Sequence, residues 1–115
     1  MIALDNADKI KGDASAATIV DYTLHGIVGS TVTQLADGQL PATIGDLYTA
    51  ASAVAVTSII VVNADAAPRT INLYLLPTGG TARRLIPKDL SLAAGSALVF
   101  DGKKICVMTS AGAIL

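Results

Sequence analysis

The sequence predicts an all-β protein, a single antiparallel β-sandwich with a jelly-roll-like arrangement and an N-terminal arm. Turn residues recur about every 8–12 positions and separate short apolar stretches, which is typical of a sandwich or barrel. All nine acidic residues are Asp and none is Glu. Asp favours turns because its short side chain bonds nearby backbone, whereas Glu favours helices. The longest apolar stretch is rich in valine and isoleucine, which prefer strands.

That longest stretch, residues 50–62, contains 13 residues without a charge. A membrane-spanning helix needs about 20 apolar residues, so the stretch is too short to span. Alanine favours a core helix, but the second half is dominated by β-branched residues, which are stiff at χ1 and prefer a pleated surface. We therefore expect a strand from about Val54 to Asn63, buried on both faces toward its end.

Further strands are expected on both sides of this one. Ile71, Leu73 and Leu75 alternate with Asn72 and Tyr74, which predicts a strand with one apolar face. Shorter strands are expected within residues 81–87, 91–102 and 103–112, and a longer one within residues 15–29.

Residues 31–40 leave two alternatives open. Thr31 and Gln34 have the spacing of a helix capping box. Asp37 and Gly38 form a pair that commonly turns a hairpin between two short strands. We favour the hairpin.

The chain length of 115 residues is enough for one core and not for two. We assign residues 15–115 to the sandwich and residues 1–14 to the arm. In the arm, Ile2, Leu4 and Ile10 lie among five charged residues. Such a segment is either disordered or ordered against a neighbouring subunit. In the second case, these three apolar residues are the expected docking anchors.

The low content of charged residues and the net charge indicate which kinds of partner the protein binds. Only 15% of residues are charged, against a usual share of about 25%, and the mean hydropathy is +0.60. A chain so poor in charge is expected to hide surface against other subunits. The net charge of −1 argues against a nucleic-acid surface, which needs clustered positive charge. We expect neither a nucleic-acid nor a membrane partner.

No pattern of reactive residues indicates an enzyme. The only histidine, His25, lies beside a glycine in a strand region, and Ser30 and Ser96 lack the Gly-x-Ser-x-Gly frame of a hydrolase nucleophile. Cys106 is the only cysteine, which excludes an internal disulfide. Its apolar neighbours favour a small core residue over a reactive thiol.

Metal and cofactor sites are not predicted either. Zinc would have one histidine and one cysteine to bind, far apart in the sequence, and a calcium loop of the EF-hand type needs a Glu that the chain lacks. No glycine-rich loop opens a helix to hold phosphate, and the few aromatic residues supply little surface for stacking a sugar. The start "MIALDNADKIKG" has two acids where a secretory signal needs an apolar core, which predicts synthesis in a cytoplasm.

Residues 47–114 resemble small β-sandwich proteins encoded among the structural genes of tailed bacteriophages. The resemblance rests on the order of six short motifs rather than on any one of them. These motifs are Leu47–Ala50, Ser58–Asn63, Ile71–Leu75, Gly79-Gly80, Ile86-Pro87 and Leu92–Gly95. The closing "TSAGAI" is also similar, whereas Ala51-Ser52-Ala53 stands where these proteins often have Pro-Ala-Gly.

The resemblance implies a non-enzymatic virion structural protein, made in the cytoplasm of a host bacterium. Within that class we favour a capsid decoration protein that associates with itself, as a trimer, and binds another virion protein such as the major capsid or a tail protein. The alternative is a tail or fibre component, or a sandwich module that binds a receptor or glycan. For either, we expect no catalytic residue, cofactor or metal.

Overall fold

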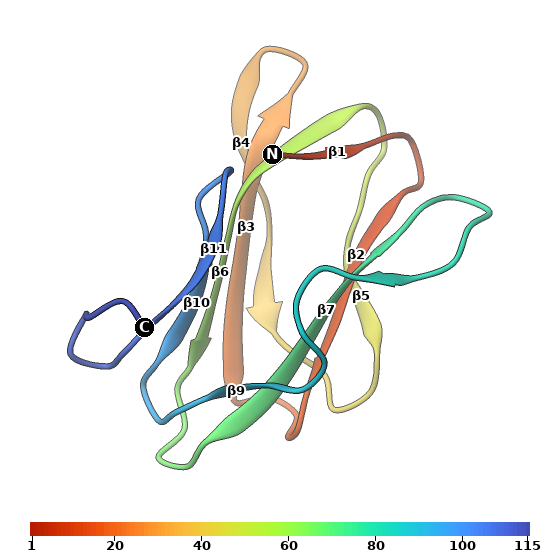
Figure 1. Ribbon diagram of the computed structural model, residues 1–115. Helices are drawn as coiled ribbons and strands as arrows, with labels where there is room; N and C mark the ends of the chain where they lie inside the picture. The colour runs from red at the N-terminus through yellow and green to blue at the C-terminus, as the bar shows by residue number, and fades with distance from the viewer.

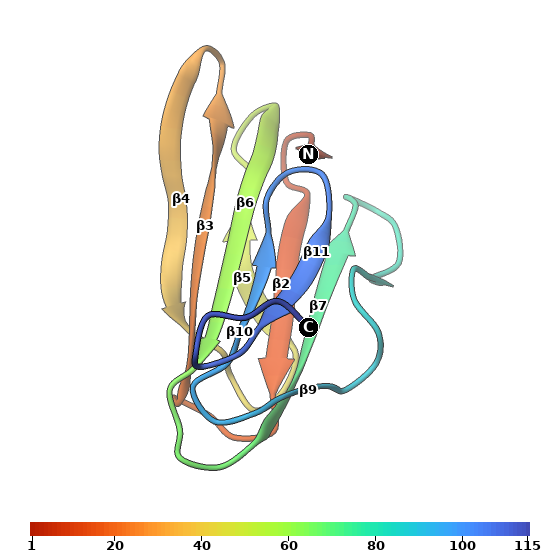
Figure 2. The same cartoon turned by 60° about the vertical axis from the view of Figure 1, so that its left-hand side comes forward.

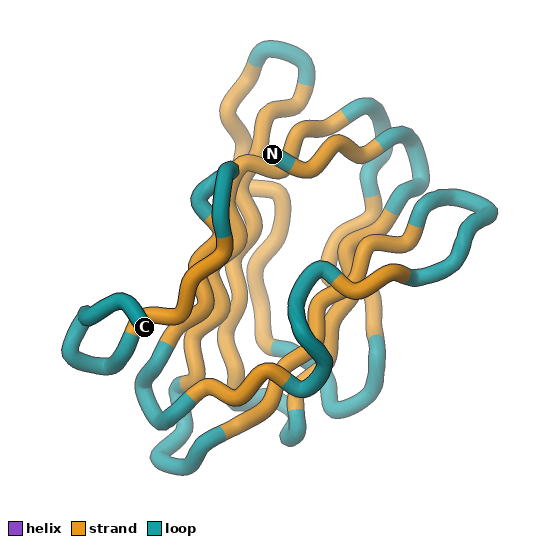
Figure 3. The backbone as a smooth tube through the Cα atoms, viewed as in Figure 1, coloured by secondary structure: helices purple, strands orange, loops and turns teal.

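The computed structural model describes all residues from 1 to 115 and contains eleven strands and no helix. Two antiparallel sheets lie face to face (Figure 1), and loops connect the strands at both ends of the molecule (Figure 3). The predicted antiparallel sandwich is therefore confirmed. The strand orders define a sandwich and do not establish the jelly-roll connectivity that was expected with it.

The six-stranded sheet is built around β6 and has the order β11-β10-β6-β3-β4 (Figure 2). Its strands are β1 (Ile2–Leu4), β3 (Val20–Val28), β4 (Thr31–Gln39), β6 (Val54–Asn63), β10 (Ala97–Phe100) and β11 (Ile105–Met108). β1 and β10 share one edge of β6, because β1 pairs with its first residues and β10 with its last ones. The predicted strand from Val54 to Asn63 is thus the centre of this sheet.

The five-stranded sheet has the order β5-β2-β7-β8, with β9 also paired to β7. Its strands are β2 (Lys9–Ala14), β5 (Gly45–Thr49), β7 (Arg69–Leu76), β8 (Arg83–Arg84) and β9 (Leu90–Leu92). β8 and β9 follow one another along the same edge of β7, and the segment between them lies at the side of the sandwich. β2 and β7 are therefore the central strands.

The core forms because alternate residues of each strand point to the same face. In β6, Val54, Val56, Ile59 and Val61 are buried. The pairing with β3 skips Thr57, and this bulge of one residue keeps both halves of β6 facing the core. In total, 19 buried hydrophobic residues from both sheets and their connecting loops form a single cluster.

Asn63 joins the two sheets at the end of β6. Its side chain is fully buried, and Nδ2 donates to the carbonyl oxygens of Ala67 at 2.9 Å and Leu92 at 3.0 Å. Its Oδ1 accepts the N–H of Asp65 at 3.0 Å. One amide thereby connects the turn between β6 and β7 to the end of β9.

Residues 1–14 do not form an arm. β1 extends the six-stranded sheet, and β2 pairs with β5 on one side and β7 on the other. Leu4 and Ile10 are 2% and 0% exposed, and Ile2 packs against the core. The expectation of an arm is wrong because the charged residues of β2 alternate with Ile10, Gly12 and Ala14, so the charges point outward while the small and apolar residues point inward.

Residues 31–40 form neither a helix nor a hairpin of their own. β4 is one strand that runs beside β3 as the edge of the six-stranded sheet, with a bulge at Leu35. The turn lies earlier, in the two-residue loop Gly29-Ser30, where Gly29 has φ +63°. A glycine at the first position of a two-residue loop suits a type II′ turn, whose twist matches that of the strands.

Gly38 stays inside β4 instead of ending it. It lies opposite Tyr22 of β3, and a Cβ at this position would lie 3.3 Å from the Tyr22 hydroxyl oxygen. The glycine therefore makes room for a core tyrosine. The prediction of a turn at Asp37-Gly38 is wrong, because Gly38 lies within the strand and packs against Tyr22.

Candidate functional site

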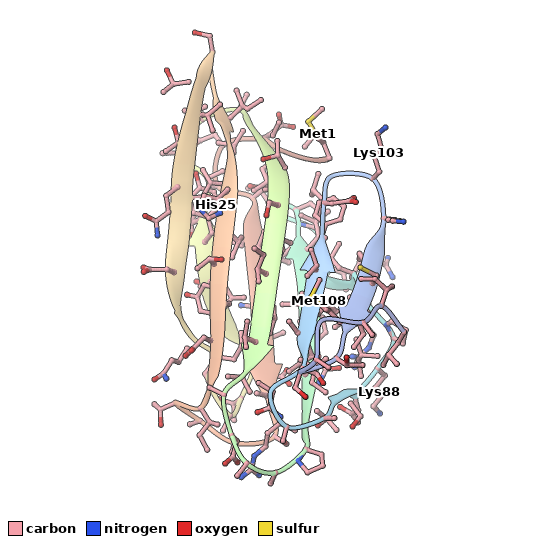
Figure 4. The ribbon with its side chains drawn as sticks, turned by 90° about the vertical axis from the view of Figure 1, so that its left-hand side faces the viewer. Met1, His25, Lys88, Lys103 and Met108 are labelled. Carbon is pink, nitrogen blue, oxygen red and sulfur yellow. The ribbon has the colours of Figure 1, made fainter.

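The side chains with catalytic potential lie apart. His25 is on β3 and Cys106 is on β11, and both β6 and β10 lie between these strands. His25 is half-buried, and its side chain makes no hydrogen bond to a carboxylate. It lies on the outer face of the six-stranded sheet (Figure 4). Ser30 is in the β3–β4 turn and Ser96 is buried before β10. No nucleophile therefore has a base beside it.

The carboxylates hold loops in place rather than form a metal site. No three His, Cys or Asp side chains converge as a set of metal ligands. Asp8 accepts the backbone N–H of Asp5 and of Thr78, each at 2.8 Å, and these bonds hold the pKa of Asp8 below its ordinary value. Asp101 accepts the N–H of Lys103 and Lys104 in the β10–β11 turn, which lowers its pKa in the same way.

Two further carboxylates pair with cations. Asp46 lies 2.7 Å from Nζ of Lys9 and 2.9 Å from Nζ of Lys11, and these lysines lower the pKa of Asp46. Arg69 lowers the pKa of Asp65. Each pair joins residues on neighbouring strands or within one turn, so these charges hold parts of the fold together.

The most connected polar cluster surrounds Asn72 on the outer side of the five-stranded sheet. Its Nδ2 donates to the carboxylates of Asp13 and Asp89, each at 2.9 Å. Its Oδ1 accepts from the Arg84 guanidinium at 2.5 Å and from the Asp89 N–H at 2.9 Å. The guanidinium also lies 5.1 Å from the centre of the Tyr74 ring. The polar atoms of Asn72 are thus paired internally, so the cluster fastens the segment after β8 to the sheet.

A groove lies at one side of the sandwich, where the two sheets do not meet. It has a volume of about 420 Å³, and seven of its nine lining residues are hydrophobic. One wall consists of Leu85, Ile86, Pro87, Leu90 and Ser91, and the other of Ile105, Cys106, Val107 and Leu115. Ile105 is 42% exposed and Leu115 is 82% exposed, so apolar surface at this side remains in contact with water.

The end of the chain shapes one wall of this groove. After β11, the chain turns and the N–H of Leu115 donates to the carbonyl oxygen of Val107 at 2.8 Å. Met108 and Ile114 form a further bridge. The last residues thereby lie along β11, the edge strand of the six-stranded sheet, and place Leu115 at the groove.

The three residues expected as docking anchors belong to the interior. Leu4 and Ile10 are buried and Ile2 packs on the core, so they are not available to a partner on the folded protein. The groove was not predicted from the sequence. Its only signal was the short apolar stretch Leu85-Ile86-Pro87, and its other wall comes from residues about twenty positions later.

Comparisons with known proteins find no match: no family model, no curated protein and no solved structure matches the chain. The chain contains no helix that is long and apolar enough to cross a membrane.

Proposed function

We propose that this chain is a non-enzymatic structural protein of a tailed-bacteriophage virion, and specifically a capsid decoration protein that associates with itself and binds the capsid surface. The observation that carries the proposal is the apolar groove formed by the segment after β8 and by β11. Water-exposed apolar side chains such as Ile105 and Leu115 gain free energy when a partner covers them.

The use of polar groups supports the same function. No buried side-chain nitrogen or oxygen lacks a hydrogen-bond partner, and the carboxylates with lowered pKa all hold turns or pair with cations. Polar chemistry thus stabilises the fold, and apolar surface is what the protein presents to a partner. The resemblance to virion proteins supplies the setting, in which binding comes from buried area rather than from a reactive site.

Co-sedimentation with empty capsids of the phage that encodes the chain tests the proposal. We expect wild-type protein to co-sediment, and Ile105→Asp to bind at least tenfold more weakly, because a carboxylate in the groove would lose its water on binding. Val32→Asp is the matched control. It places the same charge on an exposed β-branched residue of the opposite edge strand, where Val32 is 78% exposed, and should bind as wild type does.

An equal loss of capsid binding in both variants would show that the groove is not the surface that contacts the capsid. Failure of the wild-type protein to bind capsids would overturn the decoration proposal. Binding to isolated tails or to a glycan array would then identify the tail or receptor-binding alternative.

A further inference from the structure

Most of the basic residues of the chain lie in the two segments that form the walls of the groove. Residues 83–91 and 101–107 hold five of the eight Lys and Arg residues but only two of the nine Asp residues, which gives these segments a side-chain charge of +3. The rest of the chain carries −4, and the two values together give the net charge of −1. Positive charge is therefore concentrated beside the apolar groove.

The three basic residues outside these segments are already paired. Lys9 and Lys11 both contact Asp46, and Arg69 contacts Asp65. Each of these cations joins two parts of the fold, so none of them is left over for a partner.

Four exposed basic side chains beside the groove form no ion pair within the chain. They are Arg83, Lys88, Lys103 and Lys104. Lys103 and Lys104 directly precede Ile105 on one wall, and Lys88 follows Pro87 on the other. Lys88 and Lys103 lie along the same side of the molecule (Figure 4). These cations are therefore available to the carboxylates of a partner.

The pairing of β8 with β7 directs its two arginines to opposite faces of the sheet. Arg84 lies beside Tyr74, and its guanidinium lies over the ring of that residue on the outer face. Arg83 lies beside Leu75, which packs against the core. Because paired residues share a face, the side chain of Arg83 leaves the sheet on its inner side. β8 continues into Leu85, a lining residue of the groove, so Arg83 adds its charge to that wall.

The two acidic residues of these segments bond to groups of the fold. Asp101 accepts the backbone N–H groups of Lys103 and Lys104, each at 3.0 Å. Asp89 accepts Nδ2 of Asn72 at 2.9 Å. Neither carboxylate forms an ion pair with a cation beside the groove, so the groove keeps a surplus of positive charge.

An apolar groove with unpaired cations beside it indicates the chemistry of the partner. An apolar side chain of the partner gains free energy when it fills the groove, and complementary charges beside it fix the register of the contact and speed association. A nucleic acid fits less well, because none of the nine lining residues is aromatic and single-stranded bases bind by stacking on aromatic rings. A protein segment with both acidic and large apolar side chains matches both features.

We propose that the groove binds an acidic protein segment, with an apolar side chain of that segment between the two walls and its carboxylates at Arg83, Lys88, Lys103 and Lys104. This inference rests on the proposed function and specifies the chemistry of the capsid segment that the groove recognises.

Fluorescence anisotropy with short labelled peptides tests the inference without capsids. The probe alternates Asp with Leu, and two comparison peptides replace every Asp by Lys or every Leu by Ser. We expect wild-type protein to bind the Asp–Leu peptide and neither comparison peptide. Raising the salt concentration from about 0.05 M to about 0.5 M should weaken this binding, because salt screens the charges.

Lys88→Gln combined with Lys103→Gln removes one cation from each wall. We expect this double variant to bind the Asp–Leu peptide about threefold to tenfold more weakly, the combined effect of two exposed ion pairs. Thr31→Glu combined with Gln34→Glu is the matched control. It changes the net charge by the same amount on exposed positions of β4, the opposite edge of the sheet from β11, and should bind as wild type does.

Arg83→Gln combined with Lys104→Gln is the second double variant, and circular dichroism checks the fold of each. Failure of the Asp–Leu peptide to bind, equal binding of the Lys–Leu peptide, or wild-type affinity in both glutamine double variants would overturn the inference. Single-stranded DNA that binds as tightly as the Asp–Leu peptide would overturn it in favour of a general polyanion site. Self-association that the double variants abolish would overturn it in favour of a second copy as the occupant.

Failure of this inference is distinguishable from failure of the proposed function. Specific binding of the Asp–Leu peptide by a protein that does not co-sediment with capsids would count against the proposed function alone. Capsid binding that stays at the wild-type level in both glutamine double variants would overturn the acidic segment as the occupant and leave capsid decoration intact.

Discussion

At the scale of single residues, the most consequential side chain is polar. Asn63 lies at 0% exposure at the end of β6, where the chain leaves one sheet for the other. Its amide bonds two carbonyl oxygens and one N–H, of which the bond to Leu92 is buried and the other two are part-buried. No apolar residue of similar size supplies those bonds, and an unpaired buried polar group costs free energy.

We expect Asn63→Ala to lower the free energy of unfolding by about 2–4 kcal/mol, because one buried carbonyl and two part-buried backbone groups lose their partner. Urea unfolding followed by circular dichroism measures the change as a shift in midpoint at constant slope. Asn6→Ala is the control, since Asn6 is exposed in the β1–β2 turn and its side chain makes no hydrogen bond. Equal midpoints for the two variants would contradict the role assigned to Asn63.

At the scale of elements, β2 is rich in charged residues and yet occupies a central place in its sheet. Lys9, Lys11 and Asp13 give this strand the composition of a surface segment, but they occupy only its outward positions. The inward side chains Ile10 and Ala14 are buried in the core. Because the backbone of β2 also pairs with β5 and β7, this strand is central to the five-stranded sheet although it is rich in charge. β4 shows the reverse case, a strand with a single charge that lies at an edge.

Ile10→Ala should destabilise the protein by about 2–5 kcal/mol, the usual cost of a cavity in a packed core. Ile2→Ala should cost about 1 kcal/mol, because Ile2 is only half-buried and less apolar surface is lost. Thermal or urea unfolding of both variants provides the comparison. If neither variant changes stability, β2 is not part of the core and the earlier expectation of an arm regains its place.

At the scale of the whole molecule, the ionisation of four carboxyl groups and of Tyr22 makes the stability of the fold depend on pH. Asp8, Asp46, Asp65 and Asp101 all have a lowered pKa in the folded protein. A lowered pKa means that the unfolded chain binds protons more tightly, so folding is favoured above the unfolded value of about 4 and loses this contribution as the pH falls below it. Burial raises the pKa of Tyr22, which acts in the opposite direction at high pH.

We expect a broad plateau of the melting temperature around neutral pH, with a fall below about pH 4 and a second fall above about pH 10 as Tyr22 ionises on unfolding. Melting curves in buffers of constant ionic strength measure this profile. Asp46→Asn should reduce the fall at low pH, because one paired carboxylate is gone. A melting temperature that stays constant down to pH 2.5 would contradict the assignment.

The local pattern was sufficient for the fold class and for several strands. The alternation of Ile71, Leu73 and Leu75 with polar residues defined β7, and the β-branched stretch defined β6, because side chains of a strand alternate between two faces whatever the fold. The candidate site was not predictable in this way. The groove joins Leu90 to Ile105 and Leu115, and a sequence pattern carries no information on which distant segments meet.

What the sequence by itself determined is therefore a charge-poor, all-β chain that folds as an antiparallel sandwich. The tertiary structure alone decided three further points: that residues 1–14 contribute strands to both sheets, that Gly38 accommodates Tyr22 instead of forming a turn, and that Ile60 and Val62 lie on the outward side of β6. The physical reason is common to all three. Periodicity specifies which residues share a face, but only the packing of sheet on sheet decides which of the two faces is buried.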